Sequence, residues 1–443
     1  MHDIIVIGGG PGGYSAALRA ARLGGKVLLI EKSELGGVCT NKGCIPTKAM
    51  IACAEVFDKV KNAGKYGVTA GEPKADYKSM LERRDRIVSI SRKGVELLLK
   101  NAGVEVVKGV AKISGKNAVD VDGRTLEAKS IIIATGSEPR SIPGLEPDGK
   151  FILSSDDLMG LSELPQKIIV VGGGIIGVEY ASLFSKLGCK VTLVEVLDRL
   201  LPNEDEETST EIERMLRRGV EIHLKSKVES ADKAKKTAEV STPEGRKTIK
   251  ADAVLVSIGR KPVIPEGLEN AGVKYDKAGM NVDDQMQTSA AGIYAVGDVA
   301  GKHQLAHVAS AEGWVAAENC MGIAAVMQYD TIPWGIFNIP EIGRVGLTET
   351  EARRKHGEIR IGKALYSANG KASCIGEREG FCKVVCGKDG TILGVHIIGA
   401  HASDLIAEAA LAVKSRMTAN QVVQTIHSHP TLPEVFKEAC EAA

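Results

Sequence analysis

Two cysteines, Cys39 and Cys44, lie five residues apart and are the strongest candidates for redox chemistry in this chain of 443 residues. On a straight helix their Cα atoms would lie about 8 Å apart, which exceeds the limit of about 7 Å for a disulfide. A turn through Asn41 and Gly43 would shorten that distance. A thiol that opens a helix has a lowered pKa, which suits reversible disulfide chemistry at Cys44. The alternative is two ordinary thiols in a loop.

The sequence before the cysteines has the pattern of a dinucleotide-binding unit. Its elements are a strand at 3–7, a glycine loop at 8–13, a helix at 14–23 and a strand at 26–30. Gly8 would make the tight turn, Gly10 would let a pyrophosphate approach the backbone, and Gly13 would let the helix lie close to the strand. The helix N-terminus would bind the phosphates. Glu31 would accept hydrogen bonds from ribose hydroxyls.

The same pattern recurs in the middle of the chain. Its elements are a strand at 167–171, a glycine loop at 172–177, a helix at 178–187 and a strand at 190–194. Gly172, Gly174 and Gly177 stand where the first loop has its three glycines. Glu195 follows the start of this loop by 23 residues, the interval that also separates Glu31 from the first loop. The two copies indicate two different nucleotides or one dinucleotide each, and the alternative is a pair of glycine-rich turns without a ligand.

The position of the cysteine pair directly after the first nucleotide unit favours a redox disulfide over ordinary thiols. The rest of the chain predicts an α/β fold with a separate C-terminal α+β domain from residue 331 onward. Alternating stretches over 104–127 include a hairpin turn at Asp122-Gly123. Further strands are predicted at 131–136, 254–259, 293–298, 381–385 and 392–399, and helices at 308–320 and 403–414.

Composition excludes several classes of protein. The 57 Lys+Arg residues balance 56 Asp+Glu residues, and no basic stripe points to nucleic acid. No apolar run reaches the ~18 residues of a membrane span, and the N-terminus lacks the features of a signal peptide. Nine scattered cysteines in such a chain indicate a reducing, cytoplasmic compartment. No metal site is expected.

A family signature is visible in the cysteine segment, which reads Gly-Gly-Val-Cys-Thr-Asn-Lys-Gly-Cys-Ile-Pro-Thr-Lys. It resembles the active-disulfide signature of the FAD-dependent pyridine nucleotide–disulfide oxidoreductases. The resemblance covers essentially the whole chain and is closest to the branch that oxidises dihydrolipoyl groups. It includes the segments 134–137, 172–179, 258–260, 295–298, 305–307 and 427–434. The last of these, His-Ser-His-Pro-Thr-Leu-Pro-Glu, is typical of the large dimeric members.

The resemblance implies two Rossmann-like dinucleotide-binding domains and a C-terminal α+β dimerisation domain. The FAD-binding domain would comprise 1–141 and 266–328, the NAD-binding domain 142–265, and the dimerisation domain 329–443. The FAD-binding domain is discontinuous because the strand at 293–298 belongs with the first unit.

The resemblance also implies cofactor-binding residues. For FAD they are Gly8, Gly10, Gly13, Glu31, Lys48, Ala111, Thr135, Gly136, Ser137, Asp298, Leu305, Ala306 and His307. For NAD they are Gly172, Gly174, Gly177, Glu179, Glu195, Val228 and Gly259. Asp298 would hold the ribityl chain, and the backbone at 305–307 would begin a helix aimed at the flavin pyrimidine ring.

The catalytic residues implied by the resemblance are Cys39, Cys44, His429, Glu434, Lys48 and Glu179. His429 would be the general acid and base, oriented by Glu434, and would serve the disulfide of the other subunit. Lys48 would lie near the flavin, paired with Glu179. The alternatives are a surface histidine near the C-terminus and two solvated charges on helix surfaces. The surrounding motifs favour the functional assignments.

These assignments imply a reaction. A dihydrolipoyl dithiol would attack the disulfide at Cys39 while His429 takes its proton, and Cys44 would face the flavin. Electrons would pass to FAD and then to NAD. Glu195 favours NAD over NADP because its carboxylate accepts bonds from a free 2′-hydroxyl, although Arg199 could soften this preference. The implied partners are a second copy of the chain and the lipoyl domains of 2-oxoacid dehydrogenase or glycine cleavage complexes.

Other activities stay open at this point. One is a different FAD-dependent disulfide or metal reductase of the same family, of the mercuric or glutathione type. The other is a non-catalytic flavoprotein subunit, which the presence of Cys39, Cys44 and His429 disfavours. In the C-terminal domain Trp334 and Arg344 depart from the common pattern of the family, and they leave the identity of the partner complex open.

Overall fold

The first sheet of the computed structural model, which describes residues 1–443, has the strand order β3-β2-β1-β6-β5-β4, with β17 beside β6. Its strands are β1 (His2–Ile7), β2 (Val27–Glu31), β3 (Glu105–Lys108), β4 (Ala111–Gly115), β5 (Ala118–Val121), β6 (Arg124–Ile133) and β17 (Ile293–Ala295). The pairs formed by β1, β2, β3, β6 and β17 are parallel. Aliphatic side chains such as Ile5 and Ile131 are fully buried, as expected for a parallel sheet covered on both faces.

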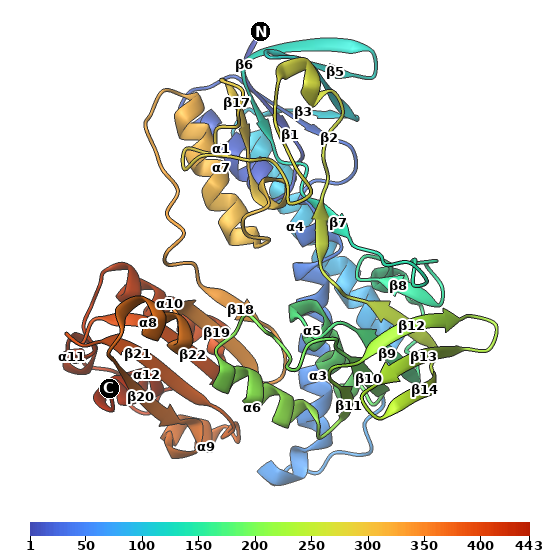
Figure 1. Cartoon of the computed structure of the whole chain (residues 1–443), viewed down its shortest axis with the longest axis vertical. Coiled ribbons are helices and arrows are strands. Elements are labelled where there is room, and N and C mark those ends of the chain that lie inside the picture. The colour runs from blue at the N-terminus through green and yellow to red at the C-terminus, as the bar shows by residue number, and fades with distance from the viewer.

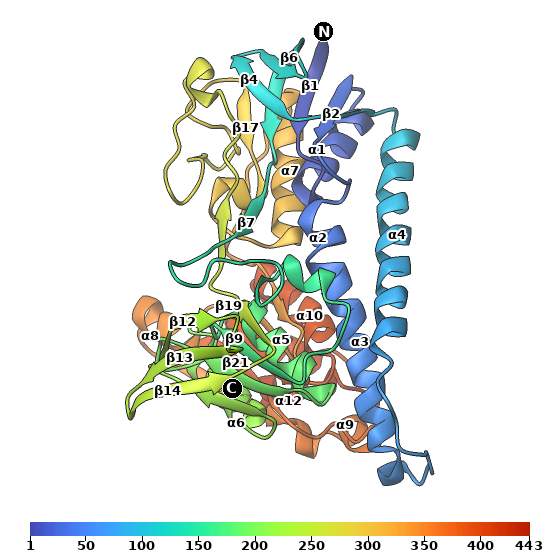
Figure 2. The ribbon, with the colours of Figure 1, turned by 90° about the vertical axis from the view of Figure 1, so that its right-hand side faces the viewer.

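Helices α1 (Pro11–Arg22) and α7 (Ala306–Cys320) lie side by side against this sheet (Figures 1 and 2). Their backbones approach closely, because a Cβ added to Gly313 would lie only 2.3 Å from the carbonyl oxygen of Gly12. Helix α1 begins three residues earlier than the sequence predicts. Pro11 occupies its first turn, where proline needs no backbone donor.

Two long helices, α3 (Cys44–Lys61) and α4 (Tyr77–Asn101), run alongside each other (Figure 2). The sequence predicts the start of α3 near Cys44 but does not predict α4. Arg84 and Leu99 are the only buried residues of α4. Its half-buried apolar residues Met80, Ile87 and Val95 nevertheless recur at helical spacing on one side, so an apolar stripe is present in the sequence.

The second sheet has the order β11-β10-β9-β15-β8, with parallel pairs throughout. Its strands are β8 (Ile152–Ser154), β9 (Lys167–Val171), β10 (Lys190–Val194), β11 (Val220–His223) and β15 (Ala253–Val256). Its helices are α5 (Ile175–Lys186) and α6 (Glu206–Leu216). A small antiparallel sheet contains β12 (Lys227–Asp232), β13 (Thr237–Thr242) and β14 (Gly245–Lys250). Strands β7 (Ser137–Pro139) and β16 (Arg260–Pro262) pair where the chain crosses between the two parallel sheets.

The third sheet is antiparallel, has the order β18-β19-β22-β21-β20 and forms the C-terminal domain. Its strands are β18 (Trp334–Ile336), β19 (Glu341–Gly346), β20 (Ile359–Leu365), β21 (Phe381–Gly387) and β22 (Ile392–Gly399). Its helices are α8 (Glu349–His356), α9 (Gly370–Cys374), α10 (Ala402–Lys414), α11 (Ala419–Gln424) and α12 (Glu434–Glu441). Helix α6 of the second dinucleotide unit lies against this sheet (Figure 1).

The predicted α/β pattern is confirmed for both nucleotide units and for the C-terminal hairpin of β21 and β22. The hairpin turn between β5 and β6 is also confirmed, and Asp122 and Gly123 have φ values of 48° and 80° there. Strand β17 pairs with β6 in the first sheet, although it follows the second unit in the chain. No helix combines the length and the apolar character needed to cross a membrane.

A glycine at the contact between α1 and α7, with a glycine in α4 as its control, tests this close packing. Gly313→Ala should destabilise the protein by about 1–3 kcal/mol, because the added methyl group would overlap the backbone of α1. Gly94, in α4, has no neighbour within 4 Å of an added Cβ. Gly94→Ala should therefore stabilise the protein by roughly 0.5–1 kcal/mol. Urea unfolding measures both changes, and equal effects of the two variants would contradict the packing.

Candidate active site

The cysteine segment lies directly against the first glycine loop. Helix α2 (Gly37–Asn41) carries Cys39, and α3 begins at Cys44 after a short break. A Cβ added to Gly37, whose φ is 59°, would lie 2.7 Å from the Cα atom of Gly10. Only glycine fits this approach, so the dithiol has a defined position beside the first loop.

Cys39 and Cys44 are both partly buried, and they lie close enough together that the pKa of each thiol depends on the other. The neighbouring Cys39 thiol, together with the positive charge of Lys48, lowers the pKa of the Cys44 thiol to about 7. The proximity of Cys44 and burial raise the pKa of Cys39. Of the two thiols, Cys44 therefore loses its proton at the lower pH.

Lys48 connects the cysteine helix to two other parts of the chain. Its ammonium group lies 2.9 and 2.8 Å from the two carboxylate oxygens of Glu179 on α5, so the expected pairing is present. Glu179 is buried, and it also accepts a hydrogen bond of 2.9 Å from the backbone N–H of Phe337. The ammonium lies 4.4 Å from the centroid of the Phe337 ring. This pair therefore joins α3, the second nucleotide unit and the C-terminal domain.

The two glycine loops have nearly the same geometry. Gly8 and Gly172 have φ values of 103° and 104°, which side-chain-bearing residues rarely adopt. A Cβ added to Gly13 would lie 1.8 Å from the carbonyl oxygen of Gly8. The corresponding distance from Gly177 to the carbonyl oxygen of Gly172 is 1.9 Å. Helix and strand therefore meet at backbone contact in both units, as the sequence predicts.

The acid at the end of each second strand braces its own glycine loop. Glu31 accepts a hydrogen bond of 2.6 Å from the N–H of Gly9. Glu195 accepts one from the N–H of Gly173 and another, of 2.8 Å, from the N–H of Leu197. A carboxylate has about four lone-pair positions, so each acid retains acceptor capacity for hydroxyl groups.

The helices that follow the loops begin with uncapped backbone donors. Gly10 and Gly174 are the N-cap residues of α1 and α5, and no side chain caps either helix. A Cβ added to Gly174 would have no neighbour within 4 Å, and the nearest atom at Gly10 is 3.8 Å away. Free N–H groups at the positive end of a helix dipole suit a pyrophosphate in both units.

Several residues assigned to FAD come together although they lie far apart in the sequence. Asp298 accepts a hydrogen bond from the hydroxyl of Ser137. Burial raises the pKa of the Asp298 carboxyl. The hydroxyl of Thr135 donates to the carbonyl oxygen of Val263 at 2.6 Å, and Gly136 has a φ of 72°. These bonds tie the end of the first sheet to the crossing strands.

Helix α7 supplies a third uncapped N-terminus. Leu305 is its N-cap residue, and Ala306 and His307 form its first turn without a side-chain cap. The His307 ring is held by a hydrogen bond of 2.8 Å between Nε2 and the carbonyl oxygen of Pro333. The positive end of this helix would stabilise negative charge on a bound ring.

Three of the assigned residues can contact a ligand only through their backbone atoms. The side chains of Ala111 on β4 and Val228 on β12 are buried in the core. Gly259 has a φ of 100°, and nothing lies within 4 Å of an added Cβ there. A nucleotide would contact main-chain groups at these positions.

His429 and Glu434 form a hydrogen-bonded pair near the C-terminus. His429 Nδ1 lies 2.9 Å from Glu434 Oε1. The backbone N–H of Thr431 donates to Glu434 at 2.8 Å, and this bond and the one to His429 lower the pKa of the carboxyl. The imidazole is 77% exposed, and it contacts neither thiol of its own chain.

His427, two residues earlier, has a structural environment. Its ring contacts the carbonyl oxygen of Thr425 and a carboxylate oxygen of Glu408, both at 2.9 Å. The side chain is 7% exposed. It therefore attaches the segment that carries His429 to α10.

Comparison with known proteins identifies the family. A family model described as pyridine nucleotide-disulphide oxidoreductase matches residues 2–313, and the model of the corresponding dimerisation domain matches residues 332–440. The chain belongs to this family. Membership of the pyridine nucleotide–disulfide oxidoreductases implies a flavin and a pyridine nucleotide as cofactors, and it makes the third sheet and its helices a dimerisation domain.

Similar proteins extend over the full chain. Dihydrolipoyl dehydrogenase of Chlorobaculum parvum is 44% identical and covers 100% of this chain and 97% of its own. A dihydrolipoyl dehydrogenase of Bacillus subtilis is 42% identical, and the match covers 98% of this chain and 97% of the relative. Among solved structures, LpdA from Mycobacterium tuberculosis has a TM-score of 0.91 at 30% identity, and 99% of each chain is covered. The HOCl-induced flavoprotein disulfide reductase RclA from Escherichia coli has a TM-score of 0.88 at 26% identity, with the same coverage.

Two residues beside the assigned flavin-binding positions of this oxidoreductase were not identified from the sequence. Glu312 is fully buried and accepts hydrogen bonds from the N–H of Gly297 at 2.6 Å and the hydroxyl of Tyr329 at 2.8 Å. Arg260 donates to Ser137 at 2.8 Å. A carboxylate among the small residues in the middle of this alanine-rich helix is the signal that could have revealed Glu312.

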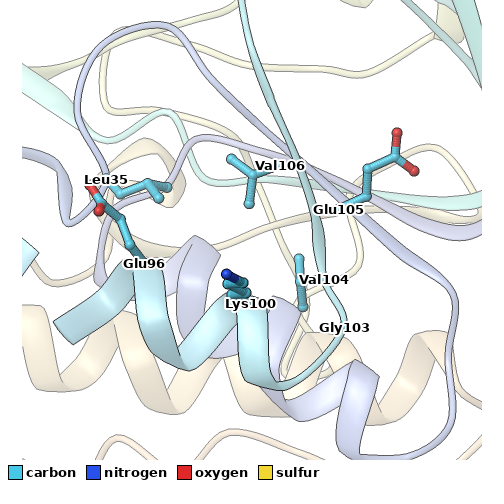
Figure 3. Close-up of a pocket in the computed structure, with 7 residues that line it drawn as sticks. All are labelled: Leu35, Glu96, Lys100, Gly103, Val104, Glu105 and Val106. Atoms are coloured by element: carbon cyan, nitrogen blue, oxygen red, sulfur yellow. The ribbon is translucent and has the colours of Figure 1, made fainter. Parts of the chain in front are cut away.

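A cavity of about 430 Å³ lies between the end of α4 and β3 (Figure 3). Its lining residues are Leu35, Glu96, Lys100, Gly103, Val104, Glu105 and Val106. None of the assigned site residues of the family lines it. Its charged groups are mixed in sign, so it gives no indication of a particular ligand.

A pair of glycine variants separates packing from nucleotide access in the second unit. Gly177→Ala should destabilise the protein by about 1–3 kcal/mol, because the new Cβ would overlap the carbonyl of Gly172. Gly174→Ala should leave the unfolding midpoint unchanged and weaken binding of the pyridine nucleotide, because its Cβ would enter the space in front of the α5 N-terminus. Thermal unfolding and calorimetric titration distinguish the two. Equal loss of stability in both variants would contradict this geometry.

The charge of Lys48 predicts a pH effect. In reduced protein the Cys44 thiolate should form with a midpoint near pH 7 and predominate above it. Lys48→Met removes the stabilising charge and should move this midpoint upward by roughly one pH unit or more. The ultraviolet absorbance of the thiolate, corrected with Cys44→Ser, measures the midpoint. Lys59→Met, an exposed position of α3, is the control, and an unchanged midpoint in Lys48→Met would refute the electrostatic explanation.

Proposed function

We propose that this chain is a dihydrolipoyl dehydrogenase that uses FAD and NAD+. The observation that carries the proposal is the Cys39–Cys44 pair, which adjoins the first glycine loop through Gly37 and the second nucleotide unit through the Lys48–Glu179 pair. The charge of Lys48 also lowers the pKa of Cys44. Dihydrolipoyl dehydrogenases that are 40–44% identical over nearly the whole chain support the choice of substrate.

The residues present fit both cofactors. The first glycine loop, Glu31, Asp298 and the α7 N-terminus would hold FAD. The second loop and Glu195 would hold NAD. FAD, when bound, accepts an electron pair from the dithiol and transfers it to the nicotinamide as hydride. We assign residues 1–141 and 266–328 to the FAD-binding domain, 142–265 to the NAD-binding domain and 329–443 to the dimerisation domain.

The cysteines carry out the exchange with substrate. One thiol of a dihydrolipoyl group attacks the Cys39–Cys44 disulfide at Cys39, which forms a mixed disulfide and releases Cys44 as a thiolate. The second substrate thiol displaces Cys39, so the substrate leaves as a cyclic disulfide and both cysteines are reduced. The low pKa of Cys44 makes it the better leaving group in the first step.

His429 of a second copy accepts the proton of the attacking thiol. Its ring is exposed and is oriented through Nδ1 by Glu434, so Nε2 would be free to reach a neighbouring subunit. Because the ring reaches neither thiol of its own chain, the active site requires a homodimer. An imidazole suits the task since its pKa lies near neutral pH.

Glu195 gives the preference for NAD over NADP. Its buried carboxylate, held by the loop at Gly173, would accept bonds from a 2′-hydroxyl and repel a 2′-phosphate. Arg199 is directed elsewhere, with a hydrogen bond of 2.7 Å to the carbonyl oxygen of Pro202. The substrate would be lipoyl groups on 2-oxoacid dehydrogenase or glycine cleavage complexes in the cytoplasm.

Anaerobic reaction of purified protein with dihydrolipoamide tests the proposal. The yellow colour should bleach and NADH should form from NAD+, with little NADPH from NADP+. His429→Gln should lower this rate by roughly 10²–10⁴-fold, whereas the exposed control His356→Gln should not change it. Reduction by NADH without any reaction with dihydrolipoamide would refute the substrate and point to another disulfide or a metal ion.

A further inference from the structure

One face of the third sheet carries a row of five cross-strand partners. They are Trp334 on β18, Arg344 on β19, His396 on β22, Lys383 on β21 and Lys363 on β20. Directly opposed residues of neighbouring strands point to the same side, so these side chains form one line, here called the cross-strand row. Lys383 and His396 are buried at 3% and 0% exposure.

Four carboxylates face the cross-strand row from two helix starts. They are Glu204, Asp205 and Glu207 at the start of α6 and Glu349 at the start of α8. Arg344 Nε lies 2.9 Å from Glu204. The Lys383 ammonium lies 2.9 Å from Asp205 and 2.7 Å from Glu349. Buried charges persist only when they are paired, so these contacts hold α6 firmly against the sheet.

The contact between Glu204 and Arg344 is an ion pair without a hydrogen bond. The second carboxylate oxygen of Glu204 has no hydrogen-bond partner, and the Nε–H of Arg344 does not point at an acceptor. The attraction is therefore between charges. Burial raises the pKa of Glu204 to about 7, and the charge of Arg344 opposes that rise.

Arg344 has a fixed orientation. Its guanidinium carbon lies 4.7 Å from the centroid of the Trp334 ring, its neighbour in the row. A planar cation stacked on an indole is held in one plane, which lysine would not reproduce. The two residues that depart from the family pattern in this domain thus form one unit directed at Glu204.

Glu204 and Asp205 end a loop that starts at the acid of the second nucleotide unit. In its middle, the N–H of Leu201 donates to the carbonyl oxygen of Gly173 at 2.9 Å. Glu195, at its beginning, accepts a hydrogen bond from the N–H of the same glycine. The loop 195–205 therefore contacts the glycine loop at two points and the cross-strand row at its end.

We propose that Arg344 and Lys383 are positioning residues for the pyridine nucleotide, because they hold Glu204 and Asp205 and thereby fix the loop 195–205 against Gly173. The inference rests on the proposed binding of NAD by the second unit. It gives the dimerisation domain a part in coenzyme affinity without any contact with the coenzyme.

The test compares Arg344→Met, which removes the charge, with Arg344→Lys, which keeps it. The control is Arg214→Met, because Arg214 forms an exposed pair with Glu211 on α6 at 2.7 Å and pairs with none of the four carboxylates that face the row. Arg344→Met should raise the KM for NAD+ and the Kd for ADP-ribose by about fivefold or more. The KM for dihydrolipoamide and kcat should change by less than about twofold. Arg344→Lys, which keeps the charge but not the stacked plane, should recover only part of the affinity.

Hydrogen–deuterium exchange gives a readout that does not depend on activity. The amides of 197–205 should exchange faster in Arg344→Met and at the normal rate in Arg214→Met. If Arg344→Met does not fold, Glu204→Gln replaces it in the test. The KM for NAD+, the Kd for ADP-ribose and the exchange rate of the amides of 197–205 should then all increase. Unchanged affinity and exchange, or an equal rise of both KM values, would overturn the inference. Wild-type protein that binds no NAD+ or ADP-ribose would instead refute the proposed function.

Discussion

The ion pair between Lys48 and Glu179 is the interaction on which the proposed active site depends most. It joins the helix that carries Cys44 to the first helix of the second nucleotide unit, and through the N–H of Phe337 it reaches the C-terminal domain. The same ammonium lowers the pKa of the Cys44 thiol. Three parts of the chain thus meet at the charge that stabilises the thiolate. Removal of either partner would leave a charge in a largely buried place.

The two nucleotide units share the same local arrangement of glycines and an acid. In each, a glycine at positive φ turns the chain, a second glycine allows backbone contact between helix and strand, and an acid braces the loop. The result is an uncapped helix N-terminus with open space in front of it. They differ in their surroundings, because the first unit adjoins the dithiol at Gly37 and the second adjoins the cross-strand row through Glu204.

The sequence predicts features that depend on a few neighbouring residues. The glycine loops, their acids and the turn at Asp122-Gly123 follow from backbone conformations that few residue types adopt, and the structure agrees with them. Contacts between distant segments are different. Glu312 gains its partners only when α7 packs against the first sheet, and the cross-strand row exists only because of the register of five strands. Helix α4 is not predicted, although Met80, Ile87 and Val95 recur at helical spacing along its inner side.

The central claim is that Cys39 and Cys44 alternate between dithiol and disulfide while the other cysteines take no part. Alkylation of air-oxidised protein, followed by peptide mapping by mass spectrometry, tests this claim most directly. Both residues should resist alkylation as one disulfide-linked peptide, and one equivalent of dihydrolipoamide should make both reactive together. Alkylation of either residue before reduction, or a disulfide that involves any other cysteine, would contradict the account.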